Sequence, residues 1–174
     1  MAILPVLTAP DPRLKVKSKP VERVDSEIRR LMDDMLETMY SAPGIGLAAP
    51  QVGVAKRVIV VDLSGPEEGP KALRIANPEI LWLSEDTATY EEGCLSVPDF
   101  YADVTRPARA RFRYLDHDNE IREIDAEGLL ATCIQHEIDH LDGILFIDHL
   151  SALKRSIVLR KLSKARKAAA AAPA

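Results

Sequence analysis

The chain has 174 residues, of which 47% are hydrophobic and 29% charged, and its formal net charge is -4 at pH 7. This length suits one domain that buries roughly two thirds of the surface of its unfolded form, so the core needs no disulfides. No apolar run approaches the ~20 residues of a membrane span, which excludes a membrane-spanning protein. The first residues lack the basic start and long apolar region of a secretory signal, so we expect a cytoplasmic protein.

The charges are distributed unevenly along the chain. Residues 150–174 carry seven basic residues and no acid, which leaves 16 basic against 27 acidic residues in the rest. This basic end fits a solvated helix followed by a frayed alanine tail, or a docking surface for an anionic partner such as RNA. We therefore divide the chain into a single catalytic domain, residues 1–150, and a basic C-terminal helix with an alanine-rich tail, residues 151–174.

The first predicted element is an amphipathic helix. From Asp25 to Tyr40 the apolar residues recur at steps of three and one, which is the spacing of one helix face. Asp25 or Ser26 can cap the start of this helix, and Pro43 and Gly44 end it. The methionines on its apolar face indicate core packing, because methionine fills irregular gaps well.

Predicted β-strands occupy the middle of the chain. RVIVVDL is a β-branched run typical of a buried strand, and ALRIANPEILWLS and TATYEEG indicate further short strands. ARARFRYLD alternates apolar residues with arginines, and the HDNE turn joins it to EIREID in a hairpin. A second helix follows from Ala126 to Asp142 and closes at Gly143. This order predicts an α+β fold, with antiparallel or mixed sheets packed around the second helix and one helix toward each terminus.

The second helix carries the pattern HExxH. His136 and His140 lie one turn apart on one face with Glu137 between them, the arrangement in which two imidazoles bind a metal and the glutamate is a general base. The other sides of this helix are apolar, so these polar side chains face a dry interior, which is costly unless a metal binds them. A chance match on a solvated helix is the alternative.

The third metal ligand differs from those of zinc peptidases. The pattern HExxHxxGxxH would need a histidine at position 146, which is Phe146, and no glutamate follows Glu137. Upstream, Cys94 in EEGCLSVP offers a thiolate, a good ligand for zinc or ferrous iron. Cys133 competes with it, but lies on the helix one turn before His136, where it more naturally lines a pocket. Cys94 with the two histidines would leave a fourth position open for water, as catalytic sites do.

Three motifs in this order resemble the signature of the peptide deformylase family: GIGLAAPQ at residues 44–51, EGCLS at 92–96 and QHEIDH at 135–140. The likeness also covers the PDPRL opening and the ILFIDHLS segment, so it extends over nearly the whole chain apart from the tail. The resemblance implies an enzyme that removes the formyl group from the N-terminal formylmethionine of new polypeptides and releases formate.

The resemblance also implies a role for particular residues. It makes three residues the ligands of one divalent metal: Cys94, His136 and His140. It makes Glu137 the acid/base residue, and the Gln51 side chain and the Leu95 backbone N–H the donors to the formyl oxygen. Five residues would contact the substrate and its methionine side chain: Ile45, Gly46, Gly93, Leu129 and Cys133. Tyr101 departs from the resemblance, since many bacterial members carry an arginine there, and this changes the rim of the substrate site.

The resemblance also implies the identity of the metal and of the partners. It implies ferrous iron in the cell, although two imidazoles and a thiolate suit zinc, nickel or cobalt as well. The substrates would be N-formylmethionyl peptides, and the basic C-terminal helix would dock on the ribosome. We expect a monomer that does not bind a membrane. Two other functions remain open at this point: a zinc endopeptidase, and a non-catalytic binding module stabilised by its metal.

Overall fold

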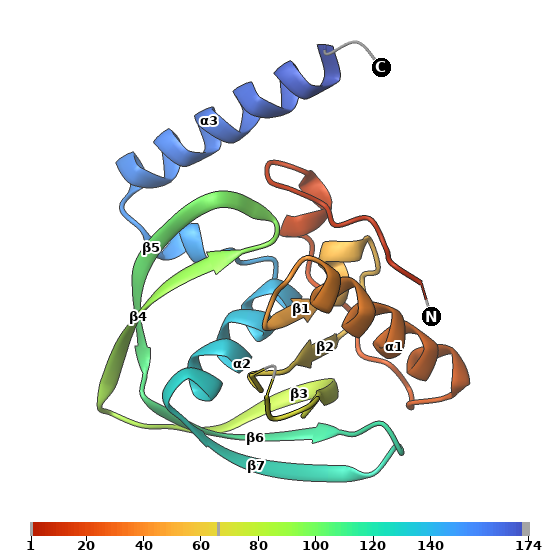
Figure 1. Cartoon of the computed structure of the whole chain (residues 1–174). Coiled ribbons are helices and arrows are strands. Elements are labelled where there is room, and N and C mark those ends of the chain that lie inside the picture. Colours follow the sequence, from red (N-terminus) through yellow and green to blue (C-terminus); the bar gives the residue numbers. More distant parts are fainter. Residues whose placement is uncertain (1, 66, 172–174) are drawn as a thin grey trace.

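The computed structural model describes residues 2–65 and 67–171. In chain order, its helices and strands are α1 (Ser26–Ser41), β1 (Gly46–Ala48), β2 (Val58–Val61), β3 (Leu73–Leu83), β4 (Thr87–Cys94), β5 (Val97–Pro107), β6 (Arg109–Leu115), β7 (Ile121–Glu127), α2 (Gly128–Leu141) and α3 (Ala152–Ala171). Short 3₁₀ turns lie at Pro12–Lys15, Ala49–Val52 and Phe146–His149. The fold is therefore α+β, as predicted (Figure 1).

The strands form two antiparallel sheets. One has five strands in the order β1-β2-β3-β6-β7, and the other is the β4–β5 pair. Strand β2 is buried on both faces because its side chains alternate: Ile59 and Val61 pack with α2, whereas Val58 and Val60 pack with α1. Helix α2 thus covers one face of the larger sheet, and α1 covers the other face at β1 and β2, while that face of β6 is exposed.

Helix α1 begins and ends close to the predicted residues. The Asp25 side chain accepts a hydrogen bond of 3.0 Å from the Ile28 N–H and caps the helix, which ends at Ser41. Its buried face carries Met32, Met35 and Met39, each fully buried in the core, as expected from the helical spacing.

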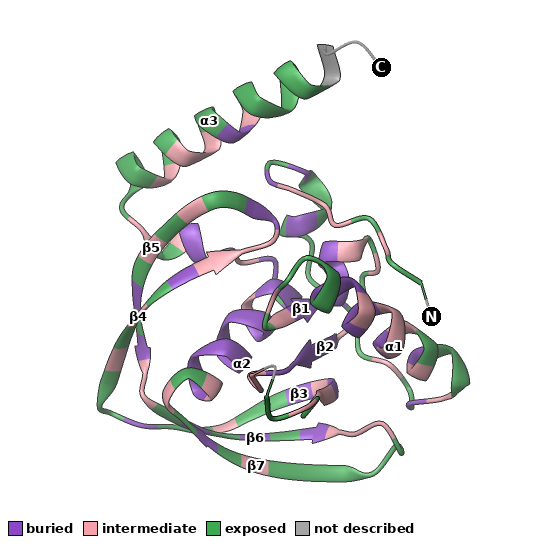
Figure 2. Ribbon diagram, viewed as in Figure 1, coloured by how far each residue is buried: buried purple, intermediate pink, exposed green. Residues whose placement is uncertain are grey.

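Helix α2 occupies the centre of the molecule. The continuous run from Ala131 to Ile138 is buried, together with His140 and Leu141 (Figure 2). The helix is therefore not a solvated one with a chance HExxH pattern. It ends where predicted, since Gly143 has φ +76°.

The strand predictions differ from the structure in two respects. ALRIANPEILWLS does form a strand, but one of 11 residues and not a short one, with irregular pairing near Asn77, whose φ is 49°. The strand β5, also of 11 residues, was not predicted at all. Its start contains Pro98 and Asp99, the latter with φ 67°, so the sequence there is typical of a turn and hides the strand.

Helix α3 lies at one end of the molecule, over a third cluster of apolar side chains. Leu162 is its buried residue and packs with residues from the N-terminal segment, β5 and the Phe146–His149 turn. The helix continues to Ala171, so the alanine tail is helical further than expected; residues 172–174 lie outside the described residues. Within residues 2–65 and 67–171, no helix is long and apolar enough to cross a membrane.

Candidate metal centre

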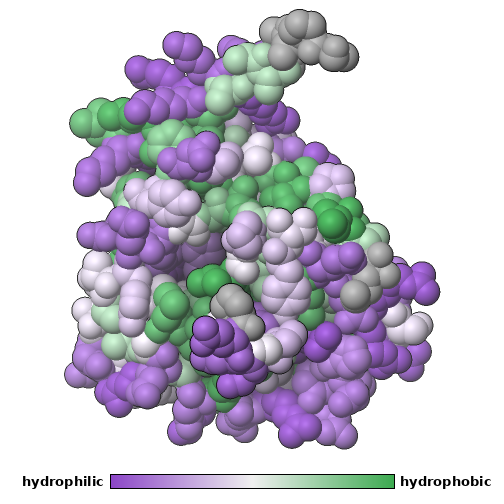
Figure 3. Space-filling model, viewed as in Figure 1, coloured by the Kyte–Doolittle hydropathy of each residue, from purple (hydrophilic) through white to green (hydrophobic). Residues whose placement is uncertain are grey.

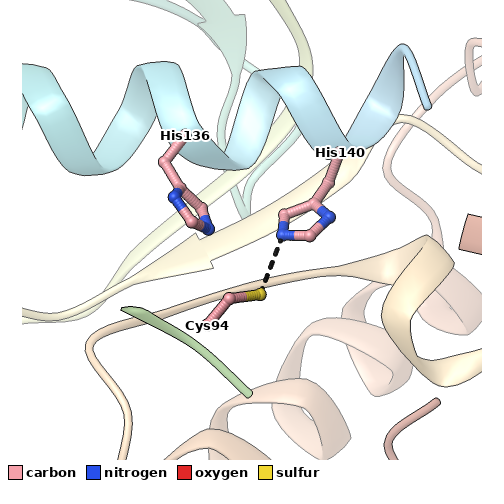
Figure 4. A group of neighbouring side chains, drawn as sticks. All are labelled: Cys94, His136 and His140. Atoms are coloured by element: carbon pink, nitrogen blue, oxygen red, sulfur yellow. Dashed lines mark hydrogen bonds between the residues drawn. The ribbon is translucent and has the colours of Figure 1, made fainter. Parts of the chain in front are cut away.

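Cys94 lies at the end of β4, and His136 and His140 lie in the second half of α2, with His140 in its last turn; the fold brings the three side chains together. Each offers one ligand atom, and these atoms all lie within 4.8 Å of one another. The side chains point toward a common space, and the Cys94 Sγ lies 3.3 Å from His140 Nε2 (Figure 4). The two imidazoles lie one helical turn apart with ring centroids separated by 5.0 Å. Thiolate and imidazole are the donor types that bind divalent zinc or iron.

A buried ion-pair network lies behind His136. Its Nδ1 is 2.8 Å from Glu92 Oε1, and Glu92 accepts two further hydrogen bonds from Arg106, at 2.8 and 2.9 Å. Arg106 also donates to Asp139 at 2.8 Å, and His149 Nε2 lies 2.8 Å from the same carboxylate oxygen. A carboxylate on the outer nitrogen of a ligating histidine fixes the orientation of the ring.

Residues of this network escaped the sequence analysis. A partial signal for Glu92 was available, because it lies two residues before Cys94 on a predicted strand, although the strand pairing is irregular between them. Arg106 and His149 had no such local signal, because they reach the site through strand pairing and chain reversal. Phe146, which excludes the peptidase pattern, stacks on the His136 ring with centroids 6.1 Å apart.

Burial sets the protonation of the site. It raises the pKa of the Glu137 carboxyl to about 7 and lowers the pKa of His140 well below its ordinary value. Burial also opposes charge on His136, but hydrogen bonds to Cys94 and Glu92 hold its pKa well above the usual range. Burial raises the pKa of the Cys133 thiol and so disfavours its thiolate form.

The donor set fits a divalent metal. Burial lowers the pKa of His140 and so favours the neutral imidazole that binds a metal, and Glu137 Oε1 is buried without a hydrogen-bond partner among the described residues. Such an unpaired carboxylate oxygen is costly in a protein interior and is explained by a ligand or water in the adjoining space. The Cys133 Sγ instead points to the Ile45 carbonyl oxygen, 3.8 Å away.

A cavity of about 610 Å³ opens beside these residues. All of the predicted site residues except His140 line it, and His140 is only 1% exposed beneath it. Ile45 and Leu129 are 46% and 43% exposed, so neither is a plain core residue. Gly46 has a steric reason to be glycine, because a Cβ there would lie 2.4 Å from Glu137 Oε2.

The Gln51 side chain is held in one orientation. Its Oε1 accepts a hydrogen bond of 2.9 Å from the Ala48 N–H, which turns the amide nitrogen toward the cavity wall. Nε2 donates to Ser96 Oγ at 3.0 Å and lies 3.4 Å from Cys94 Sγ. The amide N–H groups are therefore fixed beside the candidate ligand Cys94, in a side chain that is 1% exposed.

Comparison with known proteins identifies the family. The family model described as "Polypeptide deformylase" matches residues 3–156. The chain belongs to the peptide deformylase family. The peptide deformylase of Phenylobacterium zucineum is 62% identical over 169 residues, which cover 97% of this chain and all of the relative. That of Agrobacterium fabrum is 55% identical over 168 residues, covering 97% of this chain and 99% of the relative.

Solved deformylase structures share the fold. A crystal structure from Ehrlichia chaffeensis in complex with actinonin has a TM-score of 0.90 at 44% identity, covering 94% of this chain and 98% of that one. A structure from Legionella pneumophila has a TM-score of 0.89 at 46% identity, covering 99% and 100%. Deformylases are metalloenzymes that remove N-formyl groups, so the two other functions left open by the sequence, the endopeptidase and the binding module, are not favoured.

Proposed function

We propose that this chain hydrolyses the formyl group of N-formylmethionyl peptides in the cavity beside α2, with Cys94, His136 and His140 holding one divalent metal. The observation that carries the proposal is the convergence of these three ligand atoms within 4.8 Å, next to the unpaired carboxylate oxygen of Glu137. When bound, the metal would act as a Lewis acid and lower the pKa of water toward neutrality.

Glu137 moves the proton in this proposal. Because burial raises its pKa to about 7, the carboxyl can accept a proton from the attacking water and deliver it to the departing amine near neutral pH. Water adds to the formyl carbon, the C–N bond breaks, and the products are formate and a free N-terminal amine. The position of Glu137 on the buried face of α2 keeps bulk water away from this transfer.

Gln51 and Leu95 stabilise the charge that develops on the formyl oxygen. Both line the cavity, and the Ala48 N–H orients the Gln51 amide. The Gln51 N–H that now faces Cys94 Sγ at 3.4 Å would turn to the formyl oxygen, while the other keeps its bond to Ser96. The substrate contacts that we propose come from residues of the cavity wall: Ile45, Gly46, Gly93, Leu129 and Cys133. Ile45 and Leu129 supply the exposed apolar surface for a methionine side chain.

The metal, cellular site and partners complete the proposal. We assign ferrous iron as the metal in the cell, with zinc, nickel or cobalt able to occupy the same thiolate and imidazole donors. The enzyme acts as a monomer in the cytoplasm, as a single catalytic domain over residues 1–150. The basic helix and alanine-rich tail of residues 151–174 bring it to the ribosome, where formylated chains emerge.

Formate release tests the reaction. Anaerobically purified protein should release formate from formyl-Met-Ala-Ser and leave internal peptide bonds intact. Glu137→Gln should lose at least about a hundredfold in kcat, the lower range for a positioned acid/base group, while its metal content is retained. Glu67→Gln, an exposed substitution in a surface turn, is the matched control. Absence of formate from the unmodified enzyme would refute the proposal.

Replacing each of the two cysteines in turn by alanine tests which of them binds the metal. We expect Cys94→Ala to lose the metal and Cys133→Ala to retain most of it, because only Cys94 lies with the two imidazoles. The measurement is metal per chain after gel filtration, with circular dichroism as the check on folding. The opposite result would show that Cys133 is the ligand.

A further inference from the structure

The outer rim of the cavity carries an exposed aromatic ring in a fixed place. Tyr101 lines the cavity and is 69% exposed. Its ring lies against Gly93, because a Cβ built at Gly93 would lie 2.5 Å from Tyr101 Cε1 and 2.6 Å from Cδ1. The absence of a side chain at Gly93 therefore allows the ring to lie against the backbone of β4, while the rest of the ring remains open to the cavity and solvent.

Acidic residues lie on the same rim and strand face as this ring. Glu91 and Asp99 also line the cavity and are exposed. In the β4–β5 register Glu91 lies opposite Asp103, and the alternation of strand side chains places both on the face of Tyr101. Within the described part of the chain none of these three acids has an ion-pair partner within 4.0 Å, and the cavity lining contains no lysine or arginine.

This charge pattern works against the stability of the hairpin. Like charges directly opposite each other on paired strands are destabilising. Arrangements that cost stability in this way are expected at functional sites. The two other acids that line the cavity have separate roles, since Glu92 is paired with Arg106 and Glu137 is the acid/base residue of the proposed function. The rim therefore carries negative charges without ion-pair partners among the described residues, at Glu91 and Asp99, beside the exposed ring of Tyr101.

We propose that Tyr101, with Glu91 and Asp99, selects formylated peptides that carry a lysine or arginine within the first two residues after methionine. The inference rests on the proposed function, which places the formyl end of the peptide at Glu137 and the following residues toward the rim. The aliphatic stem of a basic side chain packs on the ring while its cation interacts with the π-face and with the two carboxylates. An acidic side chain in the same place is repelled.

A set of amidated peptides tests this preference, because amidation removes the terminal carboxylate. The set contains formyl-Met-Lys-Ala-Ala, formyl-Met-Ala-Lys-Ala, formyl-Met-Ala-Ala-Ala and formyl-Met-Ala-Glu-Ala. We expect kcat/KM for the better lysine peptide to exceed that of the neutral one by about three- to tenfold, the effect of an exposed cation–π contact with added charge attraction. The kcat/KM of the glutamate peptide should be lower than that of the neutral peptide. In 0.5 M salt the differences in kcat/KM among the peptides should become smaller, because salt screens the charges.

Substitutions at the rim test which residues cause the preference for basic peptides. The readout is the ratio of kcat/KM between the better lysine peptide and the glutamate peptide. Tyr101→Ala should reduce this ratio, whereas Tyr101→Phe should retain most of it because the ring remains. The double substitution Glu91→Gln, Asp99→Asn should reduce it further and remove its salt dependence; asparagine at 99 tolerates the left-handed backbone. Glu85→Gln, on the β3–β4 turn outside the cavity, is the matched control.

The outcomes separate this inference from the proposed function. A ratio near one in the unmodified enzyme, or a ratio that Tyr101→Ala and the double substitution leave unchanged, would overturn the selection of basic residues while formate release upholds the reaction. Failure to release formate from any of the four peptides would overturn the proposed function instead.

Discussion

Glu92 joins the candidate metal centre to the interior of the protein. It is 6% exposed and contacts two groups at once, the outer nitrogen of His136 and the guanidinium of Arg106. A buried carboxylate is stable only when it is paired and hydrogen-bonded, and the two parallel bonds from Arg106 meet that need. The same bonds hold Glu92 in place behind His136. The orientation of the His136 ring therefore depends on Arg106, although Arg106 does not contact the ring.

Removal of Arg106 therefore tests this dependence. We expect Arg106→Gln to weaken metal affinity by about 10-fold, the lower end of the range for losing the outer partner of a ligating histidine, because Arg106 acts on His136 only through Glu92. The measurement is competition with a chelator, with the free energy of unfolding recorded in parallel. Arg111→Gln breaks an exposed pair with Asp125 on the neighbouring strand and is the matched control. Equal affinities in the two variants would show that Arg106 serves only the fold.

At the scale of the element, α2 must stop directly after its second histidine. The Gly143 N–H donates to the His140 carbonyl at 3.1 Å, and the Ile144 N–H donates to the Asp139 carbonyl at 2.9 Å. Gly143 adopts φ +76°, and a Cβ there would lie 2.5 Å from the Lys15 carbonyl oxygen. The helix end is thus packed against the N-terminal segment through a position that admits glycine alone.

Alanine at this position should destabilise the protein for two reasons. The left-handed conformation costs a non-glycine residue about 1–2 kcal/mol, and the contact with the Lys15 backbone adds to this cost. Gly69→Ala isolates the first effect, because Gly69 has φ +73° and no atom within 4 Å of an added Cβ. In chemical denaturation, Gly143→Ala should therefore lose more free energy of unfolding than Gly69→Ala. An equal loss of free energy of unfolding in the two variants would mean that the contact between position 143 and the Lys15 backbone relaxes without destabilising the protein.

Local sequence signals explain which elements could be predicted. The limits of α1 and the end of α2 follow from a cap, helical spacing and glycine, all within a few residues of each helix end. The start of α2 was predicted two residues too early, at Ala126, because Ala126 and Glu127 still pair with β6 and the helix begins at Gly128 without a side-chain cap. The strand β5 could not be predicted in this way, because its pairing with β4 compensates for the turn-like Pro98 and Asp99. In the same way, the contact of Glu92 with Arg106 depends on the strand register and not on spacing along the chain.

At the scale of the whole molecule, α3 differs from the rest of the chain in charge and in burial. Hydrophilic side chains cover much of its visible surface (Figure 3). It is attached by the buried Leu162 and by Arg166, whose guanidinium lies 3.9 Å from the Asp11 carboxylate. Deleting the helix would therefore expose core residues as well as remove charge, so charge neutralisation is the better test of the proposed ribosome docking.

Three exposed lysines of α3 carry this test: Lys161, Lys164 and Lys167. Their joint replacement by glutamine should weaken binding to ribosomes while leaving formyl-Met-Ala-Ser hydrolysis intact, since all three lie outside the cavity. Lysines that neutralise nucleic-acid phosphates release counterions, so the slope of log K against log salt should become shallower by roughly 0.7–0.9 for each phosphate that the variant no longer neutralises. The matched control carries the same change at three other exposed lysines: Lys17, Lys19 and Lys71. Sedimentation at several salt concentrations measures both quantities, and an affinity equal to that of the control would exclude α3 as the docking element.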